Sequence, residues 1–261
     1  MTLKYILAAG TALLACAAHA AQPACSAYSG AHTTALVELY TSEGCDSCPP
    51  ADMWLASLFA RGFRPDQVVP LALHVDYWDY IGWKDPYAKQ AFAARQRKLA
   101  QMWRPVMVYT PQVLLQGQDF RRWGSAEFTE AVTRINSKPA RARIALLIRA
   151  VTREAIQAEL AAQLLDPADK KGAAVYLAAY ENKLASDVSA GENRGKRLEH
   201  DFVVREWIGP IGFGEAANLE EKRALPLLPS ANPKLSGVAA FVQNRSTGEV
   251  LQALMLPACS G

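Results

Sequence analysis

The chain has 261 residues, of which 51% are hydrophobic, so it can bury a substantial core and form one large domain or two ordinary ones. This composition excludes a chain that is disordered throughout. Lys and Arg exceed Asp and Glu by only three and are scattered, so no broad phosphate-binding surface is indicated and nucleic acid is not expected as a partner.

Residues 1–20 are typical of a secretory signal peptide. Lys4 gives a positive start, residues 5–18 are apolar or small, and Ala18-His19-Ala20 has the small-x-small pattern of a cleavage site. An alternative interpretation takes Leu13-Leu14-Ala15-Cys16 as a lipoprotein cleavage box, which would leave Cys16 as a lipid anchor. No later segment has the roughly 20 continuous apolar residues of a membrane span. We therefore expect a periplasmic or secreted protein, cleaved after Ala20, with no membrane span.

Cleavage after Ala20 would leave four cysteines, which are Cys25, Cys45, Cys48 and Cys259. Four cysteines can pair completely in an oxidising compartment, and chain termini often lie close together. We therefore predict a structural disulfide between Cys25 and Cys259. Closing so long a loop would stabilise the fold by about 5 kcal/mol in the chain-entropy model.

The N-terminal half alternates between segments that favour strands and segments that favour helices. The strand-like segments are short and rich in β-branched and aromatic residues, and the helix-like segments carry apolar stripes. In chain order, the predicted elements are a strand at 33–40, a helix at 49–62, a strand at 68–75, a helix at 86–103, a strand at 113–115, a returning strand at 118–121 and a helix at 125–135. This order predicts a sheet with crossover helices.

The sequence pattern changes between residues 138 and 143. Short strand-like segments separated by turn residues follow, and they predict a β-rich domain over residues 143–261. The segment 152–165 is ambiguous, because its Ala, Glu and Gln content favours a helix whereas its alternation would also fit a hairpin.

The motif Cys45-Asp46-Ser47-Cys48 lies between a predicted strand and a predicted helix. A thiol at a helix N-terminus faces unpaired backbone N–H groups and the positive end of the helix dipole, which favour the thiolate. We therefore predict Cys45 as the attacking thiol and Cys48 as the resolving thiol. The carboxylate of Asp46 works against the thiolate, so we expect a moderate or reducing potential.

Metal ligation and an inert disulfide are the alternatives for this motif. A structural zinc site needs four ligands, and the sequence has no second Cys-x-x-Cys and no closely spaced pair of histidines. His74 is the only histidine expected near the motif. We therefore expect no metal and no cofactor.

The predicted elements, together with Thr110-Pro111, resemble a thioredoxin-like domain over residues 33–137. In that family a cis-proline begins the strand that faces the dithiol. The resemblance therefore implies that Pro111 belongs to the catalytic site and that Thr110 presents its backbone to the substrate. The sequence departs from thioredoxin itself in having Leu39 in place of a buried acid and Gly44 in place of a tryptophan, which argues against a general reductase.

A second resemblance covers nearly the whole chain, to a secreted bacterial family of unknown function whose N-terminal half is thioredoxin-like. It rests on the segments VELYTSEGCDSCPPAD, HVDYWDYIGWKDPYA, RQ at 95–96, YTPQ and GENRGKRLEHDFVVRE. The expected fold class is therefore α/β, with a thioredoxin-like domain at 33–137 and a smaller β-rich, sandwich-like domain at 143–261.

The segment HVDYWDYIGWKDPY concentrates aromatic rings and carboxylates beyond the second predicted strand. One interpretation is a rigid aromatic lid that completes the core. The other is a rim that contacts substrate through Tyr77, Trp78 and Trp83. In GENRGKRLEHDFVVRE, the charged side chains on and before the predicted strand are interpreted as solvated strand charges, with a binding face as the alternative; they are Arg194, Lys196, Arg197, His200 and Arg205.

These features predict a thiol–disulfide oxidoreductase whose partners are protein thiols or disulfides and a redox partner protein. The alternative is a non-enzymatic binding protein in which the Cys45–Cys48 disulfide is structural.

Overall fold

The computed structural model of the protein describes residues 25–103 and 106–259. The predicted signal peptide, its cleavage site and the alternative anchor at Cys16 lie outside these residues. Within the described ranges, no helix has the length and apolar character needed to cross a membrane.

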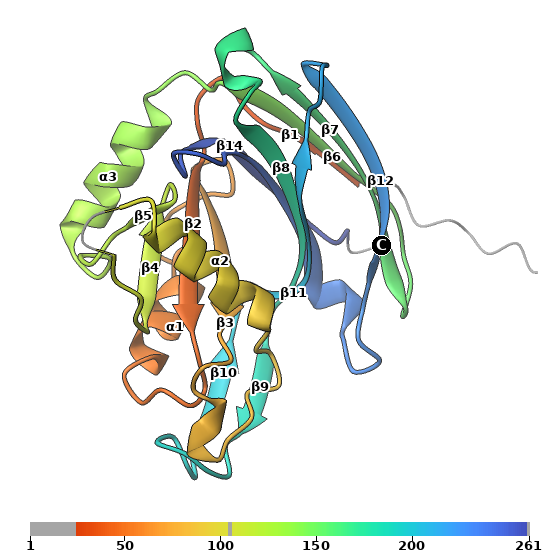
Figure 1. Ribbon diagram of the computed structural model, residues 1–261. Coiled ribbons are helices and arrows are strands. Elements are labelled where there is room, and N and C mark those ends of the chain that lie inside the picture. Colours follow the sequence, from red (N-terminus) through yellow and green to blue (C-terminus); the bar gives the residue numbers. More distant parts are fainter. Residues whose placement is uncertain (1–24, 104–105, 260–261) are drawn as a thin grey trace, which may run out of the picture.

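Two large β-sheets dominate the structure (Figure 1). The first has eight strands in the order β14-β13-β8-β11-β3-β2-β4-β5, and the second has four in the order β1-β6-β7-β12. A two-stranded ribbon of β9 and β10 extends from the end of the first sheet.

The strands of the eight-stranded sheet are β2 (Ala35–Thr41), β3 (Val68–His74), β4 (Gln112–Leu115), β5 (Gln118–Asp119), β8 (Ala173–Glu181), β11 (Val203–Gly212), β13 (Ser236–Asn244) and β14 (Val250–Pro257). The four-stranded sheet consists of β1 (Cys25–Tyr28), β6 (Ala142–Val151), β7 (Ala155–Leu164) and β12 (Asn218–Pro226). The ribbon consists of β9 (Leu184–Asp187) and β10 (Arg197–His200).

Three α-helices occur in the described residues, α1 (Pro49–Ala56), α2 (Gln90–Ala100) and α3 (Ala126–Asn136). Short 3₁₀ turns occur at Asp79–Ile81, Pro167–Asp169 and Pro233–Leu235. The helix α3 begins where the sequence predicts, because the hydroxyl of Ser125 accepts a hydrogen bond from the backbone N–H of Glu127.

The expected α/β fold with a thioredoxin-like domain is wrong. Strands hold 42% of the chain and helices only 17%, and the sheets are large and mostly antiparallel. The physical reason is that the strands predicted for the N-terminal half do not form a sheet of their own. The edge of β3 pairs with β11, so strands from both halves join in one sheet.

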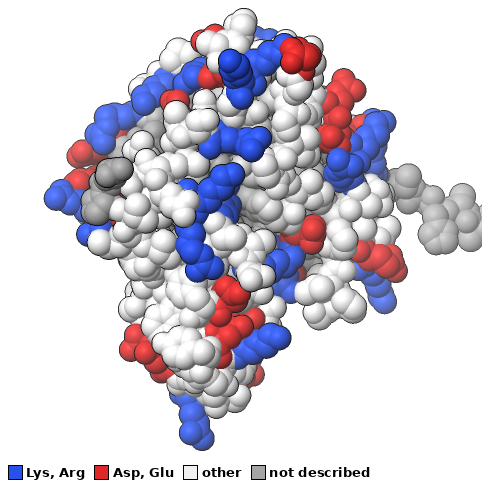
Figure 2. Space-filling view, viewed as in Figure 1, with Lys and Arg blue, Asp and Glu red and all other residues white. Residues whose placement is uncertain are grey.

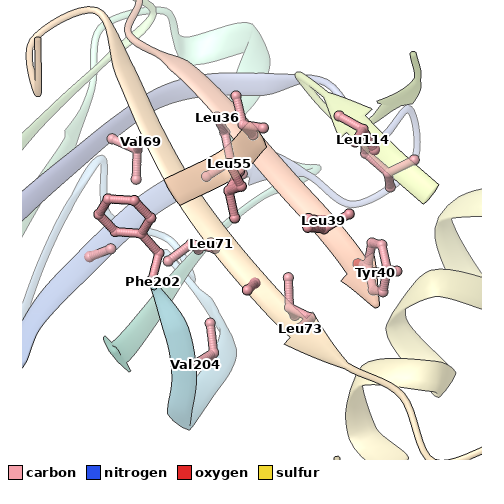
Figure 3. Packing of buried hydrophobic residues seen from close by; sticks show 14 of the residues in the cluster. Leu36, Leu39, Tyr40, Leu55, Val69, Leu71, Leu73, Leu114, Phe202 and Val204 are labelled. Carbon is pink, nitrogen blue, oxygen red and sulfur yellow. The ribbon is translucent and has the colours of Figure 1, made fainter. Parts of the chain in front are cut away.

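The strand β8 of the shared sheet is buried on both faces. Alternate residues of β8 point in opposite directions. Its even-numbered residues, such as Tyr176, pack into a core under the helices, and its odd-numbered residues, such as Leu177, pack between the two sheets. Figure 3 shows the first core around β2 and β3, where Leu55 of α1 and Phe202 beside β11 meet the same strands.

The ambiguous segment 152–165 forms β7, in a hairpin with β6. The helix suggested by its composition is absent from this described segment. The physical reason is its alternation: every second residue from Ile156 to Leu164 is buried in the core between the sheets, so burial overrides helix propensity.

The predicted disulfide between Cys25 and Cys259 is confirmed, and its Cα atoms lie 6.1 Å apart. A second disulfide joins Cys45 and Cys48. Two disulfides in one chain indicate an oxidising environment.

On the face shown in Figure 2, basic and acidic side chains are interspersed.

A buried ion pair ties α2 to the shared sheet. The guanidinium of Arg95 binds both carboxylate oxygens of Glu38 on β2, at 2.6 and 3.1 Å, and one NH₂ group also donates to the side chain of Gln243. Its Cζ atom lies 4.9 Å from the ring centroids of Tyr176 and Trp207. One side chain thus connects β2 with β8, β11 and β13.

We predict that Glu38→Ala lowers the free energy of unfolding by about 3–5 kcal/mol, because it leaves the Arg95 guanidinium buried without its counter-ion. Urea denaturation followed by circular dichroism measures the change. Asp66→Ala, which removes the exposed partner of Arg64, is the control and should leave the stability nearly unchanged. A small effect of Glu38→Ala would show that this pair does not secure the junction.

Candidate functional site

The Cys45–Cys48 disulfide lies at the N-terminus of α1, just beneath the surface. Cys48 is the N-cap residue of the helix, and its carbonyl accepts the N–H groups of Ala51 and Asp52. The exposed fractions are 1% for Cys45 and 0% for Cys48, whereas Asp46 and Ser47 between them are exposed. The disulfide is therefore shielded while the turn that carries it faces solvent.

A loop from the C-terminal half covers this turn. The amide of Asn193, which is fully buried, donates to the carbonyl oxygens of Glu43 and Cys45 at 2.8 and 2.9 Å. The adjacent carboxylate of Glu192 accepts the backbone N–H of Asp46 at 3.0 Å. The loop thus supplies the contacts that hold the disulfide turn closed.

The segment predicted as an aromatic rim contacts the other side of the turn. A Cβ atom at Gly44 would lie 3.0 Å from the Cβ of Trp78 and 3.3 Å from the Cδ1 of Ile81, so this close approach favours glycine. The indole of Trp78 in turn donates to the hydroxyl of Thr110 at 2.7 Å. The peptide bond between Thr110 and Pro111 is cis, as the resemblance implied.

The structure therefore brings Trp78, Thr110 and the disulfide turn together, and it places the other two rim residues differently. Tyr77 donates its hydroxyl to Gln96 on α2, and the indole of Trp83 donates to the carboxylate of Glu43 at 2.8 Å. All three aromatic side chains are partly buried and hydrogen-bonded within the protein. These contacts are therefore compatible with both interpretations of the segment, the aromatic lid and the substrate rim.

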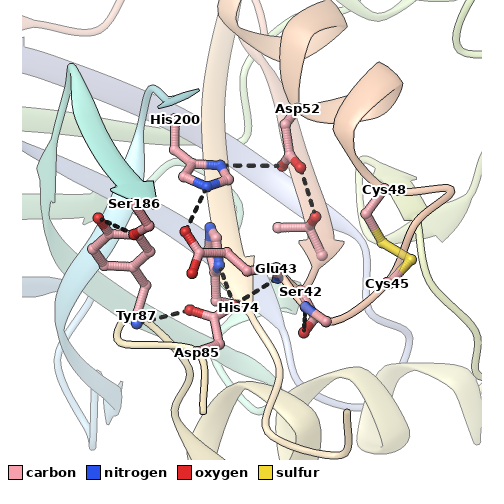
Figure 4. Close-up of polar contacts among 12 residues, drawn as sticks. Ser42, Glu43, Cys45, Cys48, Asp52, His74, Asp85, Tyr87, Ser186 and His200 are labelled. Atoms are coloured by element: carbon pink, nitrogen blue, oxygen red, sulfur yellow. Dashed lines mark hydrogen bonds and ion pairs between the residues drawn. A yellow bond between two sulfur atoms is a disulfide. The ribbon is translucent and has the colours of Figure 1, made fainter. Parts of the chain in front are cut away.

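Next to the disulfide lies a cluster of buried ionisable side chains, shown in Figure 4. Its members come from four parts of the chain: the disulfide loop, α1, the end of β3 with the loop after it, and the end of β10. They are Glu43, Asp52, His74, Asp85 and His200, all less than a tenth exposed.

Asp85 fixes the orientation of His74. Its Oδ2 atom lies 2.7 Å from Nδ1 of His74 and also accepts the backbone N–H of Glu43, while Oδ1 accepts the N–H of Tyr87. Burial alone would raise the pKa of Asp85, but the imidazole and these hydrogen bonds together lower it. Asp85 is therefore an ionised acceptor, and Nδ1 of His74 carries the hydrogen.

Glu43 holds His200 in the same way. Its Oε1 atom lies 3.0 Å from Nε2 of His200, and its Oε2 atom accepts the indole N–H of Trp83. Asp52 lies beyond His200, and its Oδ2 atom accepts the hydroxyl of Thr41 at 3.0 Å. Burial raises the pKa of Asp52 to about 7, with His200 and Thr41 opposing the shift.

Sequence reasoning missed most of this cluster. Glu43 and Asp52 flank the cysteines in the sequence, so their proximity was a usable signal. The interpretation of His200 as a solvated strand charge is wrong, because the structure buries it against Glu43. The alternation of Leu198 and His200 with Arg197 and Glu199 could have indicated that His200 shares the face of an apolar residue. Its contact with the site could not be predicted locally, since it depends on the long-range pairing of β3 and β11.

Comparison with protein families gives a match to "Protein of unknown function (DUF1223)" over residues 36–243. Comparison with curated proteins gives no match.

Two solved structures are similar. A protein of Agrobacterium tumefaciens is 25% identical, with a TM-score of 0.59 over 88% of this chain and 96% of that chain. HBP35 of Porphyromonas gingivalis is 15% identical, with a TM-score of 0.64 over 88% of this chain and 76% of that chain. The second likeness concerns the fold alone.

We predict that Asn193→Ala lowers the free energy of unfolding by about 1–3 kcal/mol, because it removes the donor of two buried carbonyl groups. The same change should speed reduction of the Cys45–Cys48 disulfide by dithiothreitol, measured by alkylation and mass spectrometry under native conditions. Asn232→Ala, which removes a cap from a 3₁₀ turn, is the control. Equal reduction rates in both variants would contradict a covering role for Asn193.

Proposed function

The chain belongs to the DUF1223 family of proteins of unknown function, and from the geometry of the site we propose that it is a thiol–disulfide oxidoreductase. The observation that carries the proposal is the closed Cys45–Cys48 disulfide in a solvent-facing turn at the N-terminus of α1. The proposed place of action is the periplasm or the extracellular space, after removal of residues 1–20.

The proposed reaction exchanges two electrons and two protons between dithiol and disulfide. In the reduced protein, the Cys45 thiolate attacks one sulfur of a substrate disulfide, forms a mixed disulfide and displaces one substrate thiolate. The Cys48 thiolate then attacks the Cys45 sulfur and displaces the second. The protein ends as the disulfide and the substrate as the dithiol, and the reverse sequence oxidises a substrate dithiol.

Cys45 is the better attacking group because of its position. It precedes the first turn of α1, next to the exposed pair Asp46 and Ser47, and its sulfur lies 3.4 Å from the hydroxyl of Ser47. Cys48 is inside the cap of the helix and fully buried, which suits a thiol that reacts only within the protein.

The proposed substrate surface consists of the residues that border the turn. Trp78 connects the turn to Thr110 and Pro111, and with Tyr77 and Trp83 it offers aromatic surface to an extended peptide. Since Cys45 is almost completely covered, the substrate or the redox partner protein must displace the loop at Glu192 and Asn193.

Two carboxylates beside the turn favour a reducing potential. Asp46 lies between the cysteines, and the carboxylate of Glu192 accepts its backbone N–H. Negative charge disfavours a thiolate, and a less stable reduced form makes the disulfide harder to reduce.

The same burial favours a second candidate function. A binding protein with a permanently closed Cys45–Cys48 disulfide would also show two covered sulfurs and a loop held by Asn193. In that case the disulfide serves only to fix the loop that precedes α1.

A trapping experiment separates the two functions. We predict that Cys48→Ala, mixed with a synthetic peptide disulfide, forms a mixed disulfide on Cys45 that dithiothreitol releases, as seen by mass spectrometry. The reason is that the resolving thiol is missing. Cys45→Ala is the matched control and should form no adduct, because Cys48 lies at the N-cap of α1, whereas Cys45 lies beside the exposed Asp46. The absence of an adduct on Cys45 would leave the binding protein as the better account.

A further inference from the structure

Three buried side chains direct unpartnered atoms at one point. Oδ1 of Asp52, Nε2 of His74 and Nδ1 of His200 have no hydrogen-bond partner among the described residues. Each of these three residues also offers one ligand atom within 4.8 Å of a ligand atom on the other two. A buried polar atom without a partner is costly, so three that converge require a common explanation.

The opposite side of each group is held in place. Nδ1 of His74 donates to Asp85, Nε2 of His200 donates to Glu43, and Oδ2 of Asp52 accepts from a threonine hydroxyl. When an imidazole uses its single N–H on one side, its other ring nitrogen presents a lone pair. With Asp52 ionised, the three unpartnered atoms are then all acceptors, and no donor among the described residues pairs with them.

The cluster is also rich in buried carboxyl groups. Glu43, Asp52 and Asp85 place three of them beside the imidazoles of His74 and His200, in a space from which water is largely excluded, where a bound cation would stabilise their ionised forms. An ion pair between His200 and Asp52 is a weak alternative, because Nδ1 and Oδ1 are 4.0 Å apart. It would also leave Nε2 of His74 without a partner.

We propose that Asp52, His74 and His200 bind a divalent transition-metal ion of the zinc class. Two imidazole nitrogens and one carboxylate oxygen are a ligand set that zinc accepts, with a fourth position for a water molecule. The carboxylates of Asp85 and Glu43 behind the two histidines correspond to the outer hydrogen bonds that orient metal-binding imidazoles. Figure 4 shows Asp52, His200 and His74 with these partners.

The geometry needs only a small adjustment. Donor atoms about 2.0–2.1 Å from a tetrahedral zinc ion lie roughly 3.4 Å apart. Since the ligand atoms are at most 4.8 Å apart, they need to approach one another by no more than about 1.4 Å. The ion connects α1, β3 and β10, and it does so whether or not Cys45 and Cys48 exchange disulfides.

The test measures zinc binding to the mature chain with both disulfides intact and any free thiols alkylated, so that sulfur ligands do not contribute. After removal of metal with a chelator and dialysis against zinc chloride, elemental analysis should give about one zinc ion per chain. Cobalt substituted for zinc should give the visible absorption of a site with four or five ligands.

Asp52→Asn, His74→Gln and His200→Gln should each weaken zinc binding at least roughly tenfold. His32→Ala is the matched control, because His32 is exposed and forms a β-bridge with Pro139 outside the cluster, and it should bind zinc as the wild type does. Circular dichroism checks that the variants fold. Unchanged zinc binding in folded variants would overturn the proposal, and so would wild-type protein without stoichiometric zinc, whatever the variants do.

Discussion

The pairing of β3 with β11 is the contact on which the rest of the structure depends. The backbone N–H of Ala72 donates to the carbonyl of Phe202 at 2.8 Å, and Val203 aligns with Ala72 in parallel register. This short junction extends the sheet of the N-terminal half with four strands from the C-terminal half. It also brings the end of β10, with His200, to the end of β3, with His74.

The junction is secured by more than backbone hydrogen bonds. Arg95 is stacked against aromatic rings of β8, β11 and β13 while it neutralises Glu38 on β2. A buried guanidinium is strongly destabilising unless it keeps its counter-ion and its hydrogen bonds. This network therefore restricts how the strands from the two halves can meet. The loop over Cys45 depends on the same arrangement, because Asn193 lies between β9 and β10 and bonds the turn that carries the cysteines.

The sequence predicted local features well because local chemistry determines them. The strands around Leu39 and Leu71, the Ser125 cap and the Cys25–Cys259 disulfide follow from alternation, capping and cysteine pairing. The fold class was mispredicted because the order of strands and helices in residues 33–137 does not reveal whether the edge of β3 stays free. Its partner β11 begins about 130 residues later, and its own sequence reads only as one more short strand.

The same limit applies to the site. The Cys-x-x-Cys motif could be recognised from the sequence alone. The loop at Asn193 that covers it and the buried cluster beside it are assembled from residues far apart in sequence. Asn193 and His200 lie in a segment rich in charged residues, and that composition predicts a solvated surface. Only the pairing of strands across the two halves turns these two residues inward.

We propose that the Cys45–Cys48 pair changes redox state in the folded protein. The most direct test is to equilibrate the native protein in glutathione and dithiothreitol buffers of known potential and to count alkylated Cys45 and Cys48 by mass spectrometry. We expect a reversible two-electron transition at a potential well below about −120 mV, the value of a strong periplasmic oxidant. A pair that stays closed in excess dithiothreitol until the protein unfolds would contradict it.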